Sequence, residues 1–166
     1  MFAQNVFLIG FMGTGKSTIA SYLNRNYGMD VVEMDQVIVE RSGMEISELF
    51  VKYGEEYFRD LETSLLEELK TKQNTIISCG GGVVLRKKNV ALMQESGKIV
   101  LLKAEPQTIL ERVKNDKSRP LLDGKKNLDA IRALMKERCE KYEAAADIIL
   151  TVDGRKVEEI CKTLLN

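Results

Sequence analysis

The stretch "GFMGTGKST", residues 10–18, decides the fold of this chain. It matches the pattern G-x-x-x-x-G-K-[ST] and stands between a β-like run, "NVFLIG", and a segment with helical periodicity, "STIASYLNRN". Glycines let consecutive backbone N–H groups curl around an anion, and a helix that begins directly behind them adds partial positive charge. The motif therefore predicts a phosphate-binding loop between a strand and a helix.

The residue types of this loop fit a nucleoside triphosphate. Lys16 offers a movable ammonium group to the β and γ phosphates, and Ser17 offers a hydroxyl oxygen to Mg²⁺. We expect the phosphates of a nucleotide to be bound by Gly13, Thr14, Gly15, Lys16, Ser17 and Thr18.

Short apolar runs recur along the rest of the chain and are separated by longer segments with helical periodicity. They read "DVVEM", "NTIISC", "KIVLLKA" and "DIILTV". Because they are apolar on both faces, they suit strands of a parallel sheet that is covered by helices on each side. We predict an α/β fold, a doubly wound three-layer sandwich of about five parallel strands.

Length and charge limit the function classes. The chain has 166 residues, with 25 acidic and 25 basic residues dispersed along it, which predicts one domain without the extended basic face of a nucleic-acid-binding protein. The apolar run at the N-terminus is too short to span a bilayer, so we expect no membrane partner and a cytoplasmic protein.

The cysteine and histidine content limits the chemistry. The cysteines, Cys79, Cys139 and Cys161, are odd in number and scattered, which predicts reduced and mostly buried thiols. There is no histidine, which excludes Ser-His triads and imidazole acid–base chemistry. A proton acceptor must therefore be a carboxylate or a lysine.

A pair of carboxylates follows the second predicted strand. Kinases, ATPases, GTPases and sulfotransfer-related enzymes share the phosphate loop, and the N-K-x-D pattern of guanine recognition is absent. In "VVEMDQ", Glu33 and Asp35 are two residues apart, so in an extended strand both side chains would point into the crevice at its carboxyl end. One would serve Mg²⁺ and the other would orient or deprotonate an acceptor hydroxyl; two solvated charges are the alternative.

Three further segments carry candidate site residues. Arg59 lies three residues before Glu62, beside the apolar stripe of one predicted helix, and Arg138 lies at the edge of the stripe of another, so either arginine could reach a cleft or remain a surface charge. The segment "NDKSRPLLDGKKN", residues 115–127, has the composition of a lid or a plain loop. The stretch "SCGGGVVL", residues 78–85, is a second place where backbone can approach a ligand, or else a turn.

Taken in order along nearly the whole chain, these motifs resemble those of shikimate kinases. The resemblance lies in the phosphate loop, the acidic pair, F-R-x-x-E at residues 58–62, the triple glycine, R-P-L-L at residues 119–122, and Arg138 with Tyr142 four residues later. It implies a single kinase domain over residues 1–166, with strand order 2-3-1-4-5, a substrate-binding region at 33–62, a lid at 113–126, and a monomer.

The resemblance also implies a reaction and a set of acceptor contacts. The γ-phosphoryl group of MgATP would pass to the 3-hydroxyl of shikimate, giving 3-phosphoshikimate and ADP on the route to chorismate and the aromatic amino acids. Asp35 would bind that hydroxyl and act as the base, and Arg59 and Arg138 would hold the shikimate carboxylate. The remaining acceptor residues would be Glu62, which holds Arg59, Phe50 and Phe58, which shape the walls, and Gly80, Gly81 and Gly82, which approach the ring.

On the nucleotide side, the resemblance places Arg119 over the transferred phosphoryl group, where it would act together with Lys16 and Asp35. Arg112 would stack near adenine, and Arg155 would flank the base from the other side. Ser17 and Glu33 are the metal-site candidates. Glu33 stands where the family usually has aspartate, so its longer side chain would shift a water-mediated Mg²⁺ contact.

Two other functions are weighed against this one. A gluconate kinase or another small-molecule kinase on the same fold would not require Arg59 and Arg138 together with the triple glycine. A nucleotide-binding regulator without catalysis would be expected to have lost Lys16, Asp35 or Arg119, and all three are present.

Overall fold

The computed structural model describes residues 4–114 and 127–166 and contains a five-stranded parallel sheet with the order β2-β3-β1-β4-β5. This confirms the predicted α/β class and the strand order. The strands are β1 (Asn5–Ile9), β2 (Asp30–Glu33), β3 (Thr75–Ser78), β4 (Gly97–Lys103) and β5 (Ile148–Thr151).

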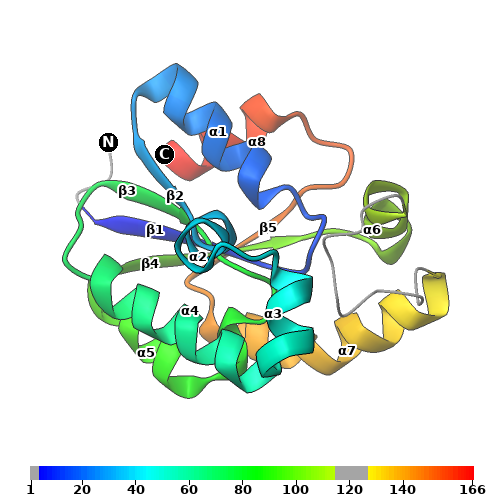
Figure 1. Ribbon diagram of the computed structural model, residues 1–166. Helices are drawn as coiled ribbons and strands as arrows, with labels where there is room; N and C mark the ends of the chain where they lie inside the picture. Colours follow the sequence, from blue (N-terminus) through cyan, green and yellow to red (C-terminus); the bar gives the residue numbers. More distant parts are fainter. Residues whose placement is uncertain (1–3, 115–126) are drawn as a thin grey trace.

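Helices cover both faces of the sheet, which gives the predicted three layers. Figure 1 shows α1 and α8 on one face and α4, α5 and α7 on the other, while α2 and α3 follow β2 and pack against α4. The helices are α1 (Lys16–Tyr27), α2 (Met34–Ser42), α3 (Ile46–Tyr53), α4 (Glu55–Leu69), α5 (Lys87–Ser96), α6 (Pro106–Val113), α7 (Leu128–Ala145) and α8 (Val157–Leu165), with a 3₁₀ turn, η1 (Val83–Leu85), after β3.

The burial of the strands explains their composition. Every residue of β1 and β3 is buried, as expected for central strands that have helices on both faces. The edge strands β2 and β5 are only partly covered, and Ile148 and Ile149 of β5 remain 41% and 49% exposed. An apolar run thus marks a strand of this sheet but does not distinguish the centre from the edge.

The strand register brings three loops to one edge of the sheet. Ser78 at the end of β3 is the Cα partner of Leu8 in β1 and of Glu33 in β2. The segments that follow β1, β2 and β3 therefore leave the sheet at the same level, at its carboxyl edge, where open parallel sheets bind their ligands.

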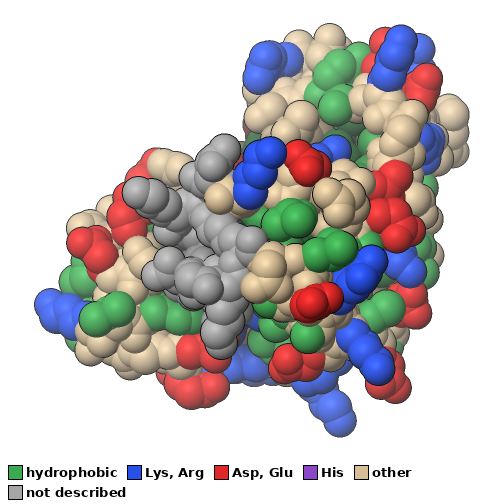
Figure 2. Space-filling model, turned by 90° about the vertical axis from the view of Figure 1, so that its right-hand side faces the viewer, with side chains coloured by type: hydrophobic (Ala, Val, Ile, Leu, Met, Phe, Trp, Pro, Cys, Tyr) green, Lys and Arg blue, Asp and Glu red, His purple; other side chains and the backbone are tan. Residues whose placement is uncertain are grey.

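The surface and the thiols agree with the composition. Figure 2 shows acidic and basic side chains interspersed over the face that it presents. Cys79 and Cys161 are buried and Cys139 is half-buried, and all three are free thiols, as predicted. No helix in the described ranges is long and apolar enough to cross a lipid bilayer. Of the predicted lid, Val113 is the last residue of α6 and Lys114 is its C-cap, and the remainder, including Arg119, lies outside the described residues.

Candidate active site

The phosphate loop connects β1 to α1 and has the backbone that its sequence predicts. Gly15 caps α1 with a φ of 97°, a left-handed conformation that glycine adopts without strain. The first turn of α1 contains no acidic residue, so its N-terminal N–H groups and partial positive charge are not neutralised by a carboxylate of that turn. This arrangement is suited to binding the phosphates of a nucleotide.

The side chains of the loop divide into two kinds. The Lys16 ammonium donates to the carbonyl oxygens of Gly10 at 2.7 Å and Phe11 at 3.1 Å, which holds it above the loop. The Thr14 hydroxyl turns inward and donates to the Phe11 carbonyl oxygen at 2.8 Å, and the Thr14 backbone N–H donates to the same oxygen at 3.3 Å, so both groups stabilise the turn of the loop. Ser17 and Thr18 line the cavity in front of the loop.

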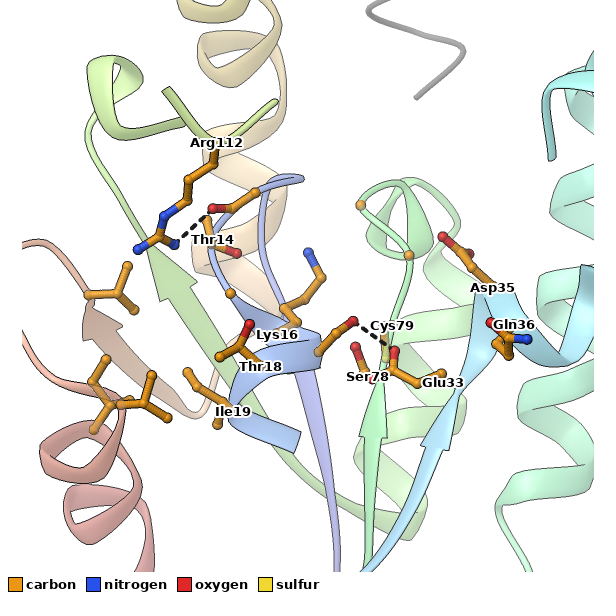
Figure 3. A pocket seen from close by; sticks show the side chains of 18 of the residues that line it. Thr14, Lys16, Thr18, Ile19, Glu33, Asp35, Gln36, Ser78, Cys79 and Arg112 are labelled. Carbon is orange, nitrogen blue, oxygen red and sulfur yellow. Dashed lines mark hydrogen bonds between the residues drawn. The ribbon is translucent and has the colours of Figure 1, made fainter. Parts of the chain in front are cut away.

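Two arginines flank the phosphate loop. Arg112 of α6 donates from Nη1 to the Gly13 carbonyl oxygen at 2.9 Å (Figure 3). Arg155, in the connection from β5 to α8, donates from Nη2 to the Thr163 hydroxyl at 2.7 Å. Both residues line the same cavity as the loop.

The acidic pair lies beside the loop, but not in the predicted geometry. The strand β2 ends at Glu33, and Asp35 already belongs to the first turn of α2, because Met34 turns inward and is fully buried. The prediction that both side chains project from one extended strand is therefore wrong. Both nevertheless line the cavity, and Figure 3 shows Glu33 nearer to the phosphate loop than Asp35.

Glu33 contacts the predicted metal ligand directly. The Ser17 hydroxyl donates to Glu33 Oε2 at 2.9 Å, which places two hard oxygen atoms next to the phosphate loop. Within the described ranges, no cluster of three or more Asp, Glu, Cys or His side chains could hold a metal ion. The Ser17 and Glu33 oxygens suit Mg²⁺ at a phosphate loop, because the ion takes one or two protein oxygens there and completes its shell with phosphate and water.

Arg59 and Glu62 form a buried ion pair on α4. Arg59 Nη1 donates to Glu62 Oε1 at 2.7 Å, and Nη2 donates to Glu55 Oε1 at 3.0 Å. Burial of the Glu62 carboxyl raises its pKa to about 7, although the charge of Arg59 opposes that shift. Burial acts to lower the pKa of Arg59, but the carboxylates of Glu62 and Glu55 outweigh it, so the pKa of Arg59 is raised. The predicted contact between Glu62 and Arg59 is present in the structure.

The glycine triplet (Gly80, Gly81 and Gly82) connects β3 to η1 and is surrounded by charged side chains. A Cβ atom on Gly80 would lie 2.8 Å from Glu62 Oε2 and 3.0 Å from Asp35 Oδ1, and one on Gly82 would overlap the Arg59 guanidinium. None of the three glycines has a φ in the left-handed region. The sequence requires glycine here because side chains approach the backbone closely, and not because of an unusual torsion angle.

Arg138 of α7 reaches the triplet from the opposite side. Its Nη1 lies 3.4 Å from the position of a Cβ on Gly81, and one turn further along α7 the Tyr142 hydroxyl donates to the Gly81 carbonyl oxygen. Arg138 is only 3% exposed, which fits the prediction that it could reach a cleft and contradicts the alternative of a surface charge. Nη1 is buried without a hydrogen-bond partner among the described residues, which leaves it able to donate to an anion.

The two predicted aromatic residues pack against each other, and Phe58 also lies against Arg59. The rings of Phe50 and Phe58 are 5.3 Å apart, and the Arg59 guanidinium carbon lies 5.2 Å from the Phe58 ring centre. Phe58 is buried and Phe50 is half-buried. The Phe58 ring thus covers one side of the guanidinium, and Phe50 packs behind it.

The site has two parts that meet at the triplet. The first is a cavity of about 890 Å³ in front of the phosphate loop, shown in Figure 3. Its lining includes predicted residues, and also residues that sequence reasoning missed: Gln36, Val39, Glu45, Ile46, Val152, Val157 and Ile160. These carry no motif, because they are ordinary helix and loop residues that the fold brings to the cavity.

The second part lies behind the triplet, where Arg59, Glu62, Arg138, Phe50 and Phe58 converge. None of these five is among the described residues that line the large cavity. Because Arg59 and Arg138 have little exposure, a carboxylate that reached them would exchange water for two desolvated guanidinium groups and be held strongly.

A phosphate loop at the edge of a parallel sheet, with two carboxylates beside it and two buried arginines behind, defines the class of P-loop kinases that act on a small molecule. The comparisons with known proteins specify the family. A family model described as shikimate kinase matches residues 12–166. The curated shikimate kinase of Geobacter sulfurreducens is 41% identical over 157 residues, which cover 95% of this chain and 86% of that protein. The chain belongs to the shikimate kinase family.

Solved structures agree with this assignment. The shikimate kinase of Acinetobacter baumannii, solved in complex with shikimate, superposes with a TM-score of 0.92 at 29% identity, covering 98% of this chain and 90% of that one. A gluconokinase from Sinorhizobium meliloti gives a TM-score of 0.55 at 13% identity, over 97% of this chain and 89% of that one, which shows a shared fold alone.

Proposed function

We propose that this enzyme transfers the γ-phosphoryl group of MgATP to the 3-hydroxyl of shikimate, giving 3-phosphoshikimate and ADP. The observation that carries the proposal is the convergence of Asp35, the Arg59–Glu62 pair and Arg138 on the glycine triplet, directly beside the phosphate loop. One hydroxyl-orienting carboxylate and two carboxylate-binding arginines match a small hydroxy acid.

On the nucleotide side, we assign the phosphates to the phosphate loop and Lys16, and the base to the region between Arg112 and Arg155. Ser17 and Glu33 would hold Mg²⁺, which neutralises phosphate charge when it is bound. Arg119, in the predicted lid at residues 113–126, would add a cation over the transferred group. Most of this machinery positions reactants and neutralises charge.

On the acceptor side, Arg59 and Arg138 would hold the carboxylate, and the walls formed by Phe50 and Phe58 would exclude water. Asp35 would accept the proton of the 3-hydroxyl while its oxygen forms a bond to the γ-phosphorus. The bond from that phosphorus to the bridging oxygen breaks at the same step, and ADP leaves. Glu62 would act through Arg59, because its carboxylate holds one guanidinium nitrogen at 2.7 Å.

The site and the thiols also suggest where and in what form the enzyme works. Three free cysteines suit a reducing compartment, and ATP is the co-substrate, so we place the enzyme in the cytoplasm. We assign it as a monomer with its site within one chain, which light scattering after size-exclusion chromatography would test.

The decisive experiment measures ADP release from MgATP with a panel of hydroxy acids that includes shikimate and gluconate. We expect stimulation by shikimate and none by gluconate. Stimulation by gluconate alone would favour the gluconate kinase that the sequence also allows. ATP binding without stimulation by any acid would favour a nucleotide-binding regulator.

A further inference from the structure

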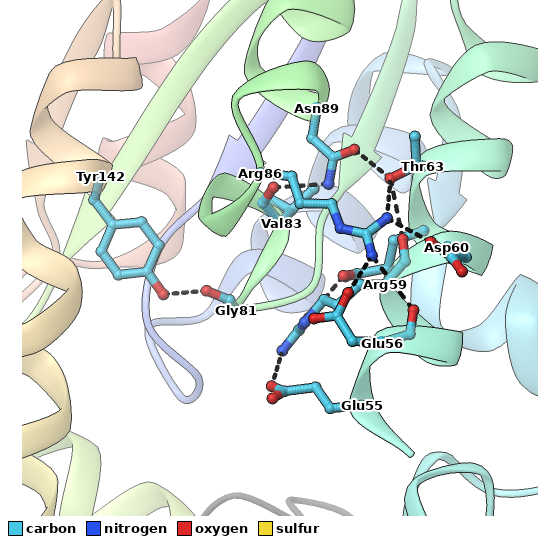
Figure 4. Close-up of polar contacts among 11 residues, drawn as sticks. Glu55, Glu56, Arg59, Asp60, Thr63, Gly81, Val83, Arg86, Asn89 and Tyr142 are labelled. Atoms are coloured by element: carbon cyan, nitrogen blue, oxygen red, sulfur yellow. Dashed lines mark hydrogen bonds and ion pairs between the residues drawn. The ribbon is translucent and has the colours of Figure 1, made fainter. Parts of the chain in front are cut away.

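A chain of hydrogen bonds joins α4 to the segment that follows the glycine triplet. Arg86 Nη1 donates to the Thr63 hydroxyl at 3.3 Å, the Thr63 hydroxyl donates to Asn89 Oδ1 at 2.7 Å, and Asn89 Nδ2 donates to the Val83 carbonyl oxygen at 2.9 Å (Figure 4). Asn89 is fully buried and Thr63 is 7% exposed. We call these contacts the Thr63–Asn89 bridge.

The donor and the acceptor of each hydrogen bond in the bridge are determined by the chemistry of its side chains. Because Asn89 must present its NH₂ group to the Val83 carbonyl, its amide oxygen faces Thr63. Arg86 can only donate, so the Thr63 oxygen accepts from it and the single hydroxyl proton remains for Asn89. That proton has a second acceptor in the Arg59 carbonyl at 3.0 Å, but the Asn89 oxygen is closer, at 2.7 Å.

Carboxylates on the outer side of α4 hold the first member of the bridge. Arg86 Nη1 donates to Asp60 Oδ1 at 2.8 Å, and Arg86 Nη2 donates to Glu56 Oε2 at 2.9 Å. These two ion pairs hold the Arg86 guanidinium against α4, next to Thr63. A chain of polarised donors and acceptors that is anchored at both ends resists displacement more than an isolated hydrogen bond does.

Two members of the bridge, Thr63 and Val83, are next to acceptor-site residues. Thr63 follows Glu62 and lies one helical turn after Arg59, whereas Val83 follows Gly82, whose backbone lies against the Arg59 guanidinium. The bridge thus fixes the two surfaces that meet where Gly82 touches Arg59. On the opposite side, the Tyr142 hydroxyl holds the carbonyl of Gly81, so the triplet is tethered from both sides.

We propose that Thr63 and Asn89 are positioning residues of the acceptor site: they set the distance between the glycine triplet and the Arg59 guanidinium. The inference rests on the proposed function, because Arg59 is assigned there to the shikimate carboxylate. Neither residue lines the cavity assigned to the nucleotide. Their loss should therefore weaken shikimate binding and leave ATP binding intact.

The test compares steady-state kinetics of three threonine variants in the full chain. Thr63→Val keeps the side-chain shape, removes the hydroxyl and leaves the buried Asn89 oxygen without its donor, and we expect it to raise the KM for shikimate by about five-fold or more. The KM for MgATP and kcat should stay within about two-fold of the wild-type values. Thr63→Ser, which keeps a hydroxyl, should have a KM for shikimate close to that of the wild type.

Thr71→Val is the matched control. Thr71 is exposed just beyond α4, and its hydroxyl bonds only the Glu68 carbonyl among the described residues. This variant should change neither KM. All rates are measured well below the Tm of each variant, because a purely structural role would lower the Tm without separating the two KM values.

Asn89→Ala provides an independent variant, and it decides the question if Thr63→Val folds poorly. It should reproduce the selective rise in the KM for shikimate. A folded variant at either position with an unchanged KM for shikimate, or with equal rises in both KM values, would overturn the inference while the wild-type enzyme remains active on shikimate. An inactive wild-type enzyme would instead overturn the proposed function, and this inference with it.

Discussion

Replacing Gly82 with alanine tests the geometry of the acceptor side directly. The new methyl group would overlap the Arg59 guanidinium, whose Nη1 and Nη2 atoms lie 2.7 and 3.0 Å from carboxylate oxygens of Glu62 and Glu55. Arg59 is 5% exposed, so the guanidinium has little room to move without leaving one of these partners or the acceptor.

The magnitude follows from the kind of contact that is lost. A hydrogen bond to a charged group contributes about 1.5–3 kcal/mol, and a tenfold change in affinity corresponds to about 1.4 kcal/mol. We therefore expect Gly82→Ala to raise the KM for shikimate about 10- to 150-fold. The KM for MgATP should change little. Among the described residues, neither the phosphate loop nor its flanking arginines, Arg112 and Arg155, contact Gly82 or Arg59.

The assay is coupled ADP release, with each substrate varied in turn, and circular dichroism checks folding. Gly81→Ala is the matched control: its Cβ would lie 3.4 Å from Arg138 Nη1 and 3.6 Å from the Met12 N atom, which is tight or ordinary contact rather than overlap. It should weaken shikimate binding more than ATP binding, but less than Gly82→Ala does. A folded Gly82→Ala enzyme whose KM for shikimate stays within about two-fold of wild type would refute the argument.

Three further substitutions test the carboxylates. Asp35→Asn should abolish phosphoryl transfer and leave ATP binding nearly intact, because it removes the proposed base; loss of ATP binding, measured by calorimetry, would contradict that role. Glu33→Asp should keep activity, with a changed Mg²⁺ dependence in a titration, because a shorter carboxylate can still reach the ion through water; an inert but folded variant would count against it. Glu62→Gln tests the buried carboxyl of Glu62, whose pKa is raised from 4.5 to about 7, so that the folded chain binds its proton more tightly than the unfolded chain. Glu62 should therefore make the free energy of unfolding of the wild type fall as the pH rises from about 4.5 to 7, and Glu62→Gln should remove this fall. If the free energy of unfolding of the wild type minus that of the variant, measured by denaturant titration, increased with pH, this expectation would be contradicted.

Local sequence patterns predicted the strands and the phosphate loop, because each of these features depends on residues that are close together in the sequence. Apolar runs marked all five strands, and the residues from Gly10 to Ser17 announced the loop between β1 and α1. Helical spacing of three placed Glu62 beside Arg59, and the structure has that contact. Such features involve residues that are close along the chain, so their composition and spacing suffice.

Contacts between distant segments were decided by the tertiary structure. Asp35 reaches the site from the first turn of α2 and not from an extended strand, because burial of Met34 turns the chain there. The sequence left Arg138 either facing a cleft or exposed as a surface charge, and the structure buries it on α7 against the glycine triplet. No local pattern distinguishes a buried arginine that faces a site from an exposed one on an amphipathic helix.

The glycine triplet and its support show the same division. The sequence indicated that backbone approaches something at residues 80–82, but only the packing of α4 and α7 around the triplet shows that charged side chains take up the space. No sequence pattern pointed to Thr63 and Asn89, because their role depends on a hydrogen bond between two buried side chains that are 26 positions apart in the chain. The sequence thus determined the fold, the phosphate loop and the candidate residues. The tertiary structure determined which of these residues meet, because their side chains come into contact only when separate helices pack against one sheet edge.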